Sequence, residues 1–393
     1  MRLLEAVARP ASEKGYIAPD NKALELVPKS NSKKSSSRLG FLDWTRGIAV
    51  AIMLQGHVFH SFAKQDFRTQ GLFVISQFLG GIGPAVFLVL TGVTLAFLMD
   101  RRQRDEFAPL QRWGAALRRA GYLFLLAFLF RLQLWAFAYP QSPWTDLLKV
   151  DVLNCMGFSI LLLSIMAIFT TADRVRLCAV LGAVIAGLSP VVSSIDWSWM
   201  PPQLSAYFVP SYAYFAFFPW AAFIAFGMSI GSLVRLARPE QMNRVMQWAT
   251  LAGIALILGG QYFSNFPYSI YPKSEFWLDS PGLIVIKLGV VLLIMAFAYI
   301  WNEYAVKDSW SWVRQFGTTS LLVYWVHIEL VYGRWFGWWK ERLSNTECVF
   351  AAIAVILLML ALSVTRTRWK TVPFASVFAP FLALSHPRRV SGD

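Results

Sequence analysis

The sequence has little charge and few cysteines, and each shortage excludes a class of protein. Only 15% of the 393 residues are charged and 56% are hydrophobic, which is more apolar surface than a soluble fold can bury. The three cysteines, Cys155, Cys178 and Cys348, are far apart and lack CxxC or His spacing, so they predict neither a disulfide framework nor a metal site. The composition indicates a polytopic membrane protein.

The first 38 residues lack the apolar core and the cleavage site of a signal peptide. They are polar, with scattered Pro, Ser and Lys, and we expect residues 1–38 to form a disordered cytoplasmic tail. A second tail, 371–393, is expected to be cytoplasmic or to lie along the inner leaflet. The region 39–370 between them is the predicted transmembrane domain.

Ten apolar segments fill this region, each close to the ~20 residues that cross a bilayer. They predict an all-α fold with about ten transmembrane helices. Two glycine-rich stretches, 78–87 and 226–231, are typical of helices that touch through small residues. The segments are 43–63, 72–99, 116–138, 148–171, 176–195, 212–234, 245–264, 281–302, 317–339 and 348–365.

The net charge of +14 is distributed in a way that argues against nucleic acid as a partner. The cations flank apolar segments, which is the bias that orients membrane proteins. If both termini are cytoplasmic, the cytoplasmic segments carry 26 Lys and Arg and the segments outside carry seven. This asymmetry favours ten spans with both termini in the cytoplasm.

The first apolar segment carries a stripe of ionisable residues. At about 100° per residue, the step from Arg46 to His57 returns to nearly the same helix face, about 16 Å further along. Asp43 and His60 share this face, while Gln55 points elsewhere. Because ionisable groups are costly in hydrocarbon, the stripe must face protein or water.

More ionisable groups lie in later spans, in the middle or outer half of the predicted membrane. An Arg131–Asp151 pair is expected because a short outer loop joins their spans. Lys287 and His327 lie at similar depths, and Glu329 does not share the face of His327. We expect these groups and His57 to converge on one polar cavity, and the alternative is a set of separate ion pairs between helices.

The chemistry of these side chains favours proton transfer near a bound phosphate. An imidazole ordinarily titrates near neutrality, so His57 is the residue expected to take a proton from a hydroxyl or an amine. Arg46 can hold a phosphate or fix the helix through Asp43. The six arginines of 100–119 can attract a phosphorylated donor from the cytosol, and positive-inside orientation explains them equally well.

Several segments resemble a known superfamily. LDWTRGIAVAIMLQGH is similar to the first helix of integral-membrane acyltransferases of the acyltransferase-3 type, in which ten residues separate an Arg and a His. Later segments are most similar to the related branch of heparan-alpha-glucosaminide N-acetyltransferase and its bacterial relatives. The matching residues are Arg46 and His57; Pro84, Phe87 and Gly92; Asp151, Val152, Leu153 and Gly157; and Gly317, Ser320, Leu321, Tyr324 and His327.

The resemblance implies an acyl-CoA donor, usually acetyl-CoA, and a carbohydrate acceptor on the far side of the membrane. The chain departs from the pattern in two places. The loop 61–71 has no His, and Gly56 precedes His57 where bacterial relatives often carry Asp.

We therefore expect an acetyl-CoA-dependent acyltransferase in the inner membrane of a bacterium, surrounded by lipid. His57, His327 and Asp151 are the expected catalytic residues, and Arg46, Lys287 and Arg131 are expected to bind the donor. The alternatives are a transporter or flippase for a lipid-linked sugar or a small anion, and a non-catalytic assembly protein. A transporter of two repeat halves would show paired broken helices, and no such halves are evident. The sequence leaves the acceptor, the acyl length and the oligomeric state open.

Overall fold

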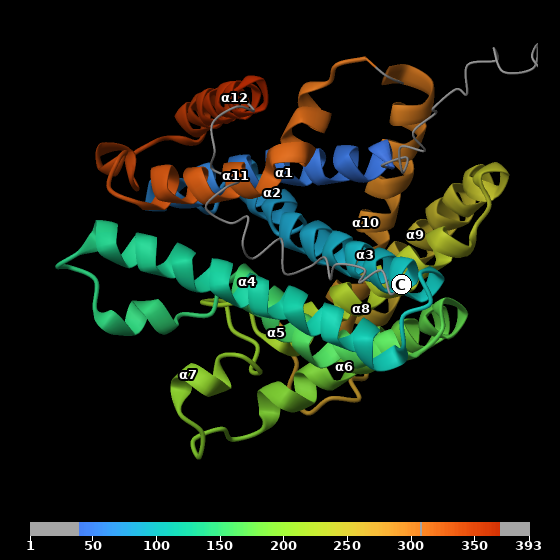
Figure 1. The fold of residues 1–393 in the computed structure, drawn as a ribbon. Helices are drawn as coiled ribbons and strands as arrows, with labels where there is room; N and C mark the ends of the chain where they lie inside the picture. The colour runs from blue at the N-terminus through green and yellow to red at the C-terminus, as the bar shows by residue number, and fades with distance from the viewer. Residues whose placement is uncertain (1–38, 307–308, 370–393) are drawn as a thin grey trace, which may run out of the picture. The chain divides into compact units, whose positions relative to one another are not determined.

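The computed structural model describes residues 39–306 and 309–369, and these residues form helices joined by loops (Figure 1). Among the described residues, the β-type pairing is a single isolated bridge between Ala63 and Leu343. The all-α prediction is therefore confirmed for the described residues. The tails predicted at 1–38 and 371–393 lie outside them.

The α-helices follow the predicted apolar segments. They are α1 (Gly40–Phe62), α2 (Gly71–Gly80), α3 (Gly83–Arg104), α4 (Pro109–Ala138), α5 (Val152–Leu163), α6 (Thr171–Ser194), α7 (Pro202–Ser205), α8 (Phe217–Leu236), α9 (Met242–Ser264), α10 (Pro281–Ile300), α11 (Trp312–Tyr332) and α12 (Asn345–Arg368). Short 3-10 turns include η2 (Trp144–Leu148) and η3 (Ser164–Ile168), and a π-helical turn, η5 (Trp301–Val306), extends α10.

Six helical stretches of the described chain are long and apolar enough to cross a membrane, so the protein is a multi-pass membrane protein. They are Gly71–Arg104, Pro109–Ala138, Thr171–Ser194, Phe217–Leu236, Pro281–Val306 and Asn345–Arg368. Each of the other predicted segments coincides with a helix, but α5 with η3 is shorter. The number of ten spans stays a prediction.

Two predicted spans are interrupted. The segment 72–99 breaks at Gly80–Gly83 into α2 and α3, and Pro84 then stands in the first turn of α3, where its missing N–H costs nothing. The segment 148–171 tightens into η3 after Leu163. Hydropathy could not reveal these breaks because the apolar run continues through both.

Glycines bring several helix pairs into backbone contact, as the sequence predicted. A Cβ added at Gly92 of α3 would overlap the Ile224 carbonyl of α8, and one at Gly227 would overlap the Val89 carbonyl. At Gly231 it would lie 2.8 Å from Cα of Val93. The α3–α8 contact therefore requires small residues at these three positions.

The same device joins α1 to α11, which run side by side in Figure 1. A Cβ at Gly317 of α11 would overlap the Asp43 carbonyl, and one at Gly47 of α1 would overlap the Val313 carbonyl. Higher along the pair, Ser61 Oγ donates to the Val331 carbonyl at 2.8 Å. These contacts fix α1 against α11 on both sides of His57.

Candidate functional site

A chamber of about 880 Å³ lies between α1, α3, α4, α5 and α11. Along α4 its lining runs from Arg119 to Ala138, a rise of about 28 Å at about 1.5 Å per residue. Charged and hydroxyl side chains are spread along the wall. They are Arg46, His57, Thr91, Thr94, Arg119, Tyr122, Arg131, Ser142, Asp146, Lys149, Asp151, Ser320, Tyr324, Glu329, Tyr332 and Arg334.

The most specific polar contact at the chamber is a histidine pair. His57 Nδ1 lies 2.9 Å from His327 Nε2, and the two rings stack with centroids 5.2 Å apart. His327 is fully buried, and its Nδ1 lies 2.8 Å from the Val323 carbonyl oxygen. His327 therefore stands behind His57, between α1 and α11, and is not itself part of the chamber lining.

These two contacts determine the tautomers of the neutral pair. A carbonyl can only accept a hydrogen bond, so His327 Nδ1 carries the proton and its Nε2 is the acceptor. His57 Nδ1 must then be the donor, which leaves the lone pair of His57 on Nε2. His57 is one of the residues that line the chamber, so the basic nitrogen of the pair is on a residue of the chamber wall.

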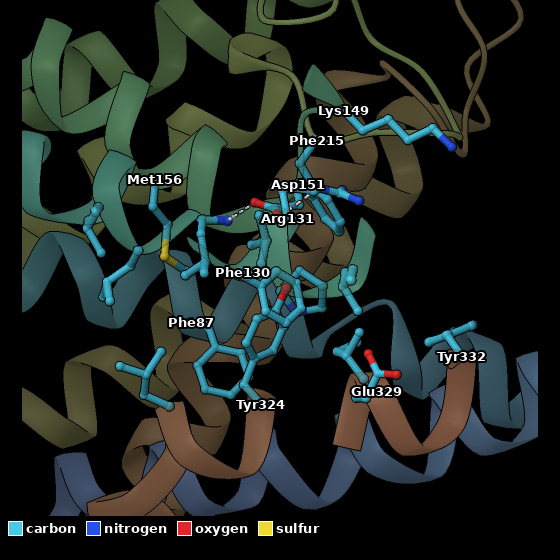
Figure 2. Close-up of a pocket in the computed structure, with 18 of the residues that line it drawn as sticks. Phe87, Phe130, Arg131, Lys149, Asp151, Met156, Phe215, Tyr324, Glu329 and Tyr332 are labelled. Carbon is cyan, nitrogen blue, oxygen red and sulfur yellow. Dashed lines mark hydrogen bonds and ion pairs between the residues drawn. The ribbon is translucent and has the colours of Figure 1, made fainter. Parts of the chain in front are cut away.

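The expected Arg131–Asp151 pair is present on the chamber wall. Arg131 Nε lies 3.2 Å from Asp151 Oδ2, in an ion pair whose angles are not those of a hydrogen bond (Figure 2). Asp151 is the N-cap of α5, and its Oδ1 accepts from the backbone N–H groups of Leu153 and Asn154. The helix start thus holds one carboxylate oxygen and turns the other towards Arg131.

Two arginines lie at the opposite end of the chamber, which we call the arginine end (Arg46 and Arg119). Arg46 pairs with Asp43 at 3.2 Å, as one of the two interpretations predicts, and it also lines the chamber. Arg119 stands over the ring of Tyr122 at 5.6 Å. With Asp43 included, this end carries an excess of positive charge.

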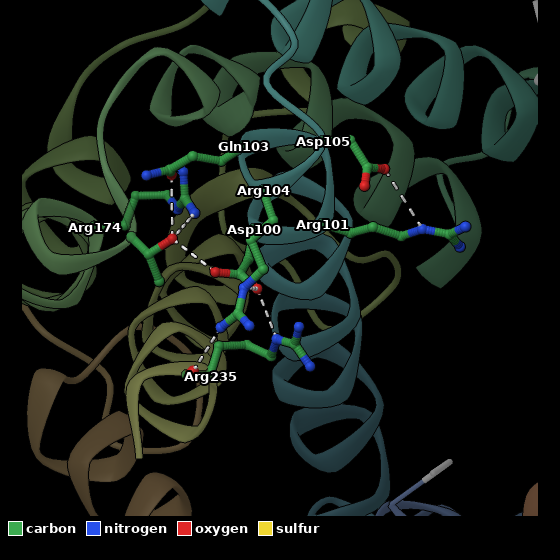
Figure 3. A network of polar contacts seen from close by, with 8 residues as sticks. Asp100, Arg101, Gln103, Arg104, Asp105, Arg174 and Arg235 are labelled. Carbon is green, nitrogen blue, oxygen red and sulfur yellow. Dashed lines mark hydrogen bonds and ion pairs between the residues drawn. The ribbon is translucent and has the colours of Figure 1, made fainter. Parts of the chain in front are cut away.

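The other arginines near this end serve the fold. Figure 3 shows Asp100 at their centre, with Oδ2 at 3.0 Å from Arg104 and 2.7 Å from Arg235, while its Oδ1 accepts from Thr171 at 3.0 Å. The fully buried Arg174 donates to the Thr171 hydroxyl at 2.8 Å. We call these five residues the Asp100 network. It ties α3, α6 and α8 together. Of the six arginines of 100–119, Arg104 belongs to this network and Arg119 is the one that lines the chamber.

Lys287 does not join the chamber, contrary to expectation. Its ammonium lies 5.0 Å from the centroid of the Trp220 ring and faces the end of α2 near Gly81. Hydropathy predicts only the depth of Lys287 in the membrane, and depth does not determine which neighbour a side chain faces. His60 is also off the chamber wall, and its Nδ1 lies 3.2 Å from the Tyr332 hydroxyl.

Several chamber residues had no predicted role, and three of them matter below. Trp135 and Tyr332 carried no signal in the sequence beyond general aromaticity, and Glu329 was noticed only for not sharing the face of His327. Glu329 lies on the chamber wall because that face of α11 is turned from α1 towards α4. A carboxyl group in the middle of an apolar run was the signal that could have singled it out.

The structure also explains the glycine before His57. A Cβ at Gly56 would lie 2.9 Å from Cα of Gly80, so α1 and the end of α2 touch through backbone alone. Around this contact, Gln77 Nε2 donates to the Gly56 carbonyl at 3.0 Å and Ser76 Oγ to Gln55 at 2.7 Å. An Asp at this position would not fit.

Comparison with known proteins identifies the family of this chain. The family profile described as heparan-alpha-glucosaminide N-acetyltransferase, catalytic, matches residues 38–265, more than half of the chain. The match includes α1 with Arg46 and His57, and α4 and α5 with Arg131 and Asp151, and it ends before α11. No curated relative matches the sequence. The chain therefore belongs to the heparan-alpha-glucosaminide N-acetyltransferase catalytic family, which places it among membrane-type acetyltransferases.

Proposed function

We propose that this protein transfers an acetyl group from cytosolic acetyl-CoA to a hydroxyl or amine of a carbohydrate acceptor on the far side of the bacterial inner membrane. The observation that carries the proposal is His57, whose Nε2 lone pair belongs to the wall of a chamber that follows α4 for about 28 Å. The hydrocarbon core of a bilayer is about 30 Å thick, so donor and acceptor can enter such a chamber from opposite faces.

The arginine end suits the donor. Phosphate groups are bound by arginine through charge-assisted hydrogen bonds, and Arg46 and Arg119 supply such donors on the wall. The charge distribution of the sequence predicts that this end faces the cytosol, where acetyl-CoA is found. A volume of about 880 Å³ lies within the range of pockets that enclose small-molecule ligands.

The chemistry follows from the tautomer of His57. Nε2 accepts the proton of the acceptor hydroxyl or amine as its oxygen or nitrogen bonds to the thioester carbonyl carbon. The C–S bond then breaks, and the CoA thiolate leaves and takes up that proton. A route through a transiently acylated His57 uses the same nitrogen as nucleophile and gives the same products.

The remaining predicted residues take narrower roles. In the tautomer described above, both nitrogens of His327 are engaged, so it positions His57. Lys287 lies outside the chamber. Arg131, expected to bind the donor, lines the chamber beside Asp151, where its positive charge can stabilise a developing oxyanion.

The test is acetyl transfer by the purified protein with labelled acetyl-CoA and a panel of sugars. We expect His57→Ala to lower the rate about 10²- to 10⁴-fold, the contribution of a general base. His60→Ala is the matched control, because His60 is an exposed residue on the same helix and is not part of the wall. An undiminished rate in His57→Ala would refute the proposal.

The same preparation distinguishes the transporter alternative. In sealed vesicles, a transporter takes up a labelled sugar or anion without any CoA thioester. Uptake that is independent of acetyl-CoA and survives in His57→Ala would replace the enzyme by a carrier.

A further inference from the structure

Four buried polar atoms on the chamber wall have no hydrogen-bond partner among the residues that the structure describes. They are Asp151 Oδ2, Glu329 Oε2, Arg131 Nε and Trp135 Nε1. Leaving a buried polar group without a partner is costly, so proteins rarely do so without a reason. Two of these atoms are acceptors and two are donors. Arg131 Nε and Asp151 Oδ2 face each other in the 3.2 Å ion pair, so Glu329 Oε2 and Trp135 Nε1 are the two that lack both a hydrogen bond and an ion pair among the described residues.

Glu329 is the least expected of the four. Its side chain lies on the wall formed by α11, only 7% of the residue is exposed, and Figure 2 shows it across the chamber from Arg131 and Asp151. Space for this carboxyl group exists because residue 333 is glycine: a Cβ there would overlap Oε1 and lie 2.9 Å from Cδ of Glu329. The backbone thus makes room for a carboxyl group that the described residues only partly use.

The opposite wall supplies the donors. Arg131 and Trp135 stand one turn apart on α4, so both reach the chamber from the same helix face. A buried indole N–H usually has a partner, as in Trp113 of the same helix, whose Nε1 donates to Ser164 Oγ at 2.7 Å. Trp135 Nε1 has none.

The charges at this end of the chamber balance. The cations of the lining here are Arg131, Lys149 and Arg334, and the acids are Asp146, Asp151 and Glu329. Lys149 Nζ lies 2.8 Å from Asp146 and, by this hydrogen bond and one from Ser142, the pKa of Asp146 is lowered, so it remains ionised at neutral pH. A ligand held here needs no charge of its own, in contrast to one held at the arginine end.

We propose that Asp151, Glu329, Arg131 and Trp135 form a subsite for an uncharged, hydroxyl-rich acceptor. This inference rests on the proposed function and extends it. A sugar hydroxyl both donates and accepts, so hydroxyls on two edges of one ring can donate to the two carboxylates and accept from the guanidinium and the indole. Glu329 and Trp135 are then specificity-determining residues for the acceptor.

Thermal unfolding without substrate separates ligand-binding groups from structural ones. Trp135→Phe removes an N–H that has no partner, so we expect its melting temperature to be unchanged or raised, whereas Trp113→Phe, the matched control, loses a hydrogen bond and melts lower. The melting temperature of Glu329→Gln is compared in the same way with that of Asp100→Asn, and we expect the larger decrease in Asp100→Asn. Losses in the first member of each pair as large as in its control would overturn the subsite.

Binding is measured by the shift in melting temperature with glucose, glucosamine and glucuronate, which are uncharged, cationic and anionic. We expect glucose to bind best, and its apparent affinity to fall at least tenfold in Glu329→Gln and in Trp135→Phe. Preference for a charged sugar, absence of glucose binding, or unchanged affinity in both variants would overturn the inference.

The subsite and the proposed function fail in different ways. If the wild-type protein and His57→Ala bind glucose equally and neither transfers acetyl, the function is wrong and the subsite stands. If the wild-type protein transfers acetyl and Glu329→Gln and Trp135→Phe keep its acceptor KM, the subsite is wrong and the function stands. An increased acceptor KM with an unchanged acetyl-CoA KM supports both.

Discussion

The Asp100 network and the chamber wall both bury carboxylates among arginines, and they differ in how completely the carboxylates are used. Both oxygens of Asp100 are engaged, by Arg104, Arg235 and Thr171. On the chamber wall, Asp151 Oδ2 has the ion pair with Arg131 but no hydrogen bond, and Glu329 Oε2 has no hydrogen-bond partner among the described residues. The first arrangement holds three helices together, and the second retains capacity for a ligand. Burial of a charge alone does not separate these roles; the use of its oxygens does.

The largest expected effect is on the Asp100 network. Asp100→Ala leaves the fully buried Arg174 without its nearby negative charge and should cost about 3 kcal/mol of unfolding free energy. Chemical denaturation in detergent measures this cost. Asp105→Ala is the control: its partner Arg101 is exposed and 3.9 Å away, so it should cost under about 1 kcal/mol. Equal losses of unfolding free energy in the two variants would show that the buried network is no more stabilising than an exposed ion pair.

The next effect concerns the contact that positions the histidine pair. Gly317→Ala forces α11 away from the Asp43 carbonyl, and overpacking of this kind costs about 1–3 kcal/mol. Because His57 is on α1 and His327 on α11, transfer activity should fall with stability. Gly121→Ala, where an added Cβ meets nothing within 4 Å, should be neutral or stabilising. Full activity in Gly317→Ala would show that the contact does not position the pair.

A third prediction addresses His327. His327→Phe removes the acceptor that holds the His57 tautomer, and we expect kcat/KM to fall about tenfold to hundredfold, part of what a general base supplies. The pH–rate profile should move on the limb that reports His57, whereas lost packing alone would lower the rate equally at every pH. His327→Gln, whose amide oxygen can accept from Nδ1, should recover part of the rate. No recovery would point to another role for His327.

The smallest effect is expected at the mouth of the chamber. The Lys149–Asp146 pair is exposed, so Lys149→Ala should change stability by under about 1 kcal/mol. Because the pair lowers the pKa of Asp146 from 3.8, its stabilisation is present above that value and is lost as the pH falls through the lowered pKa. The difference between the melting curves of wild type and variant should therefore be smaller at pH 3 than at pH 7, and 1 M salt should remove it.

Much of the fold could be predicted because it depends on local patterns. The apolar segments predicted the helices. The glycine-rich stretch 226–231 predicted that α8 makes a close helix contact, because such a contact requires small residues, but it did not identify α3 as the partner. The placement of Arg46 and His57 on one wall followed from helical spacing within α1. The breaks after Gly80 and Leu163 are set by packing with other helices and leave no mark in hydropathy.

The candidate site was predicted less completely, for a geometric reason. The sequence gives the depth of a residue in the membrane and its face on its own helix, but not which neighbour that face meets. Asp151 and Arg131 could be paired because a short loop fixes their helices. Lys287 faces Trp220 instead of the chamber, His327 lies behind His57, and Glu329 lies on the wall, and none of these directions follows from spacing alone.

The histidine pair ends at a main-chain carbonyl, that of Val323, and not at a carboxylate. Such an arrangement fixes which nitrogen of His57 is basic without adding a negative charge to neutralise an imidazolium. In the proposed reaction, a proton that arrives on His57 is therefore held briefly and passes to the thiolate released in the same turnover. The hydrogen-bonded pair therefore determines which nitrogen exchanges the proton, and it includes no carboxylate that could stabilise the protonated imidazole.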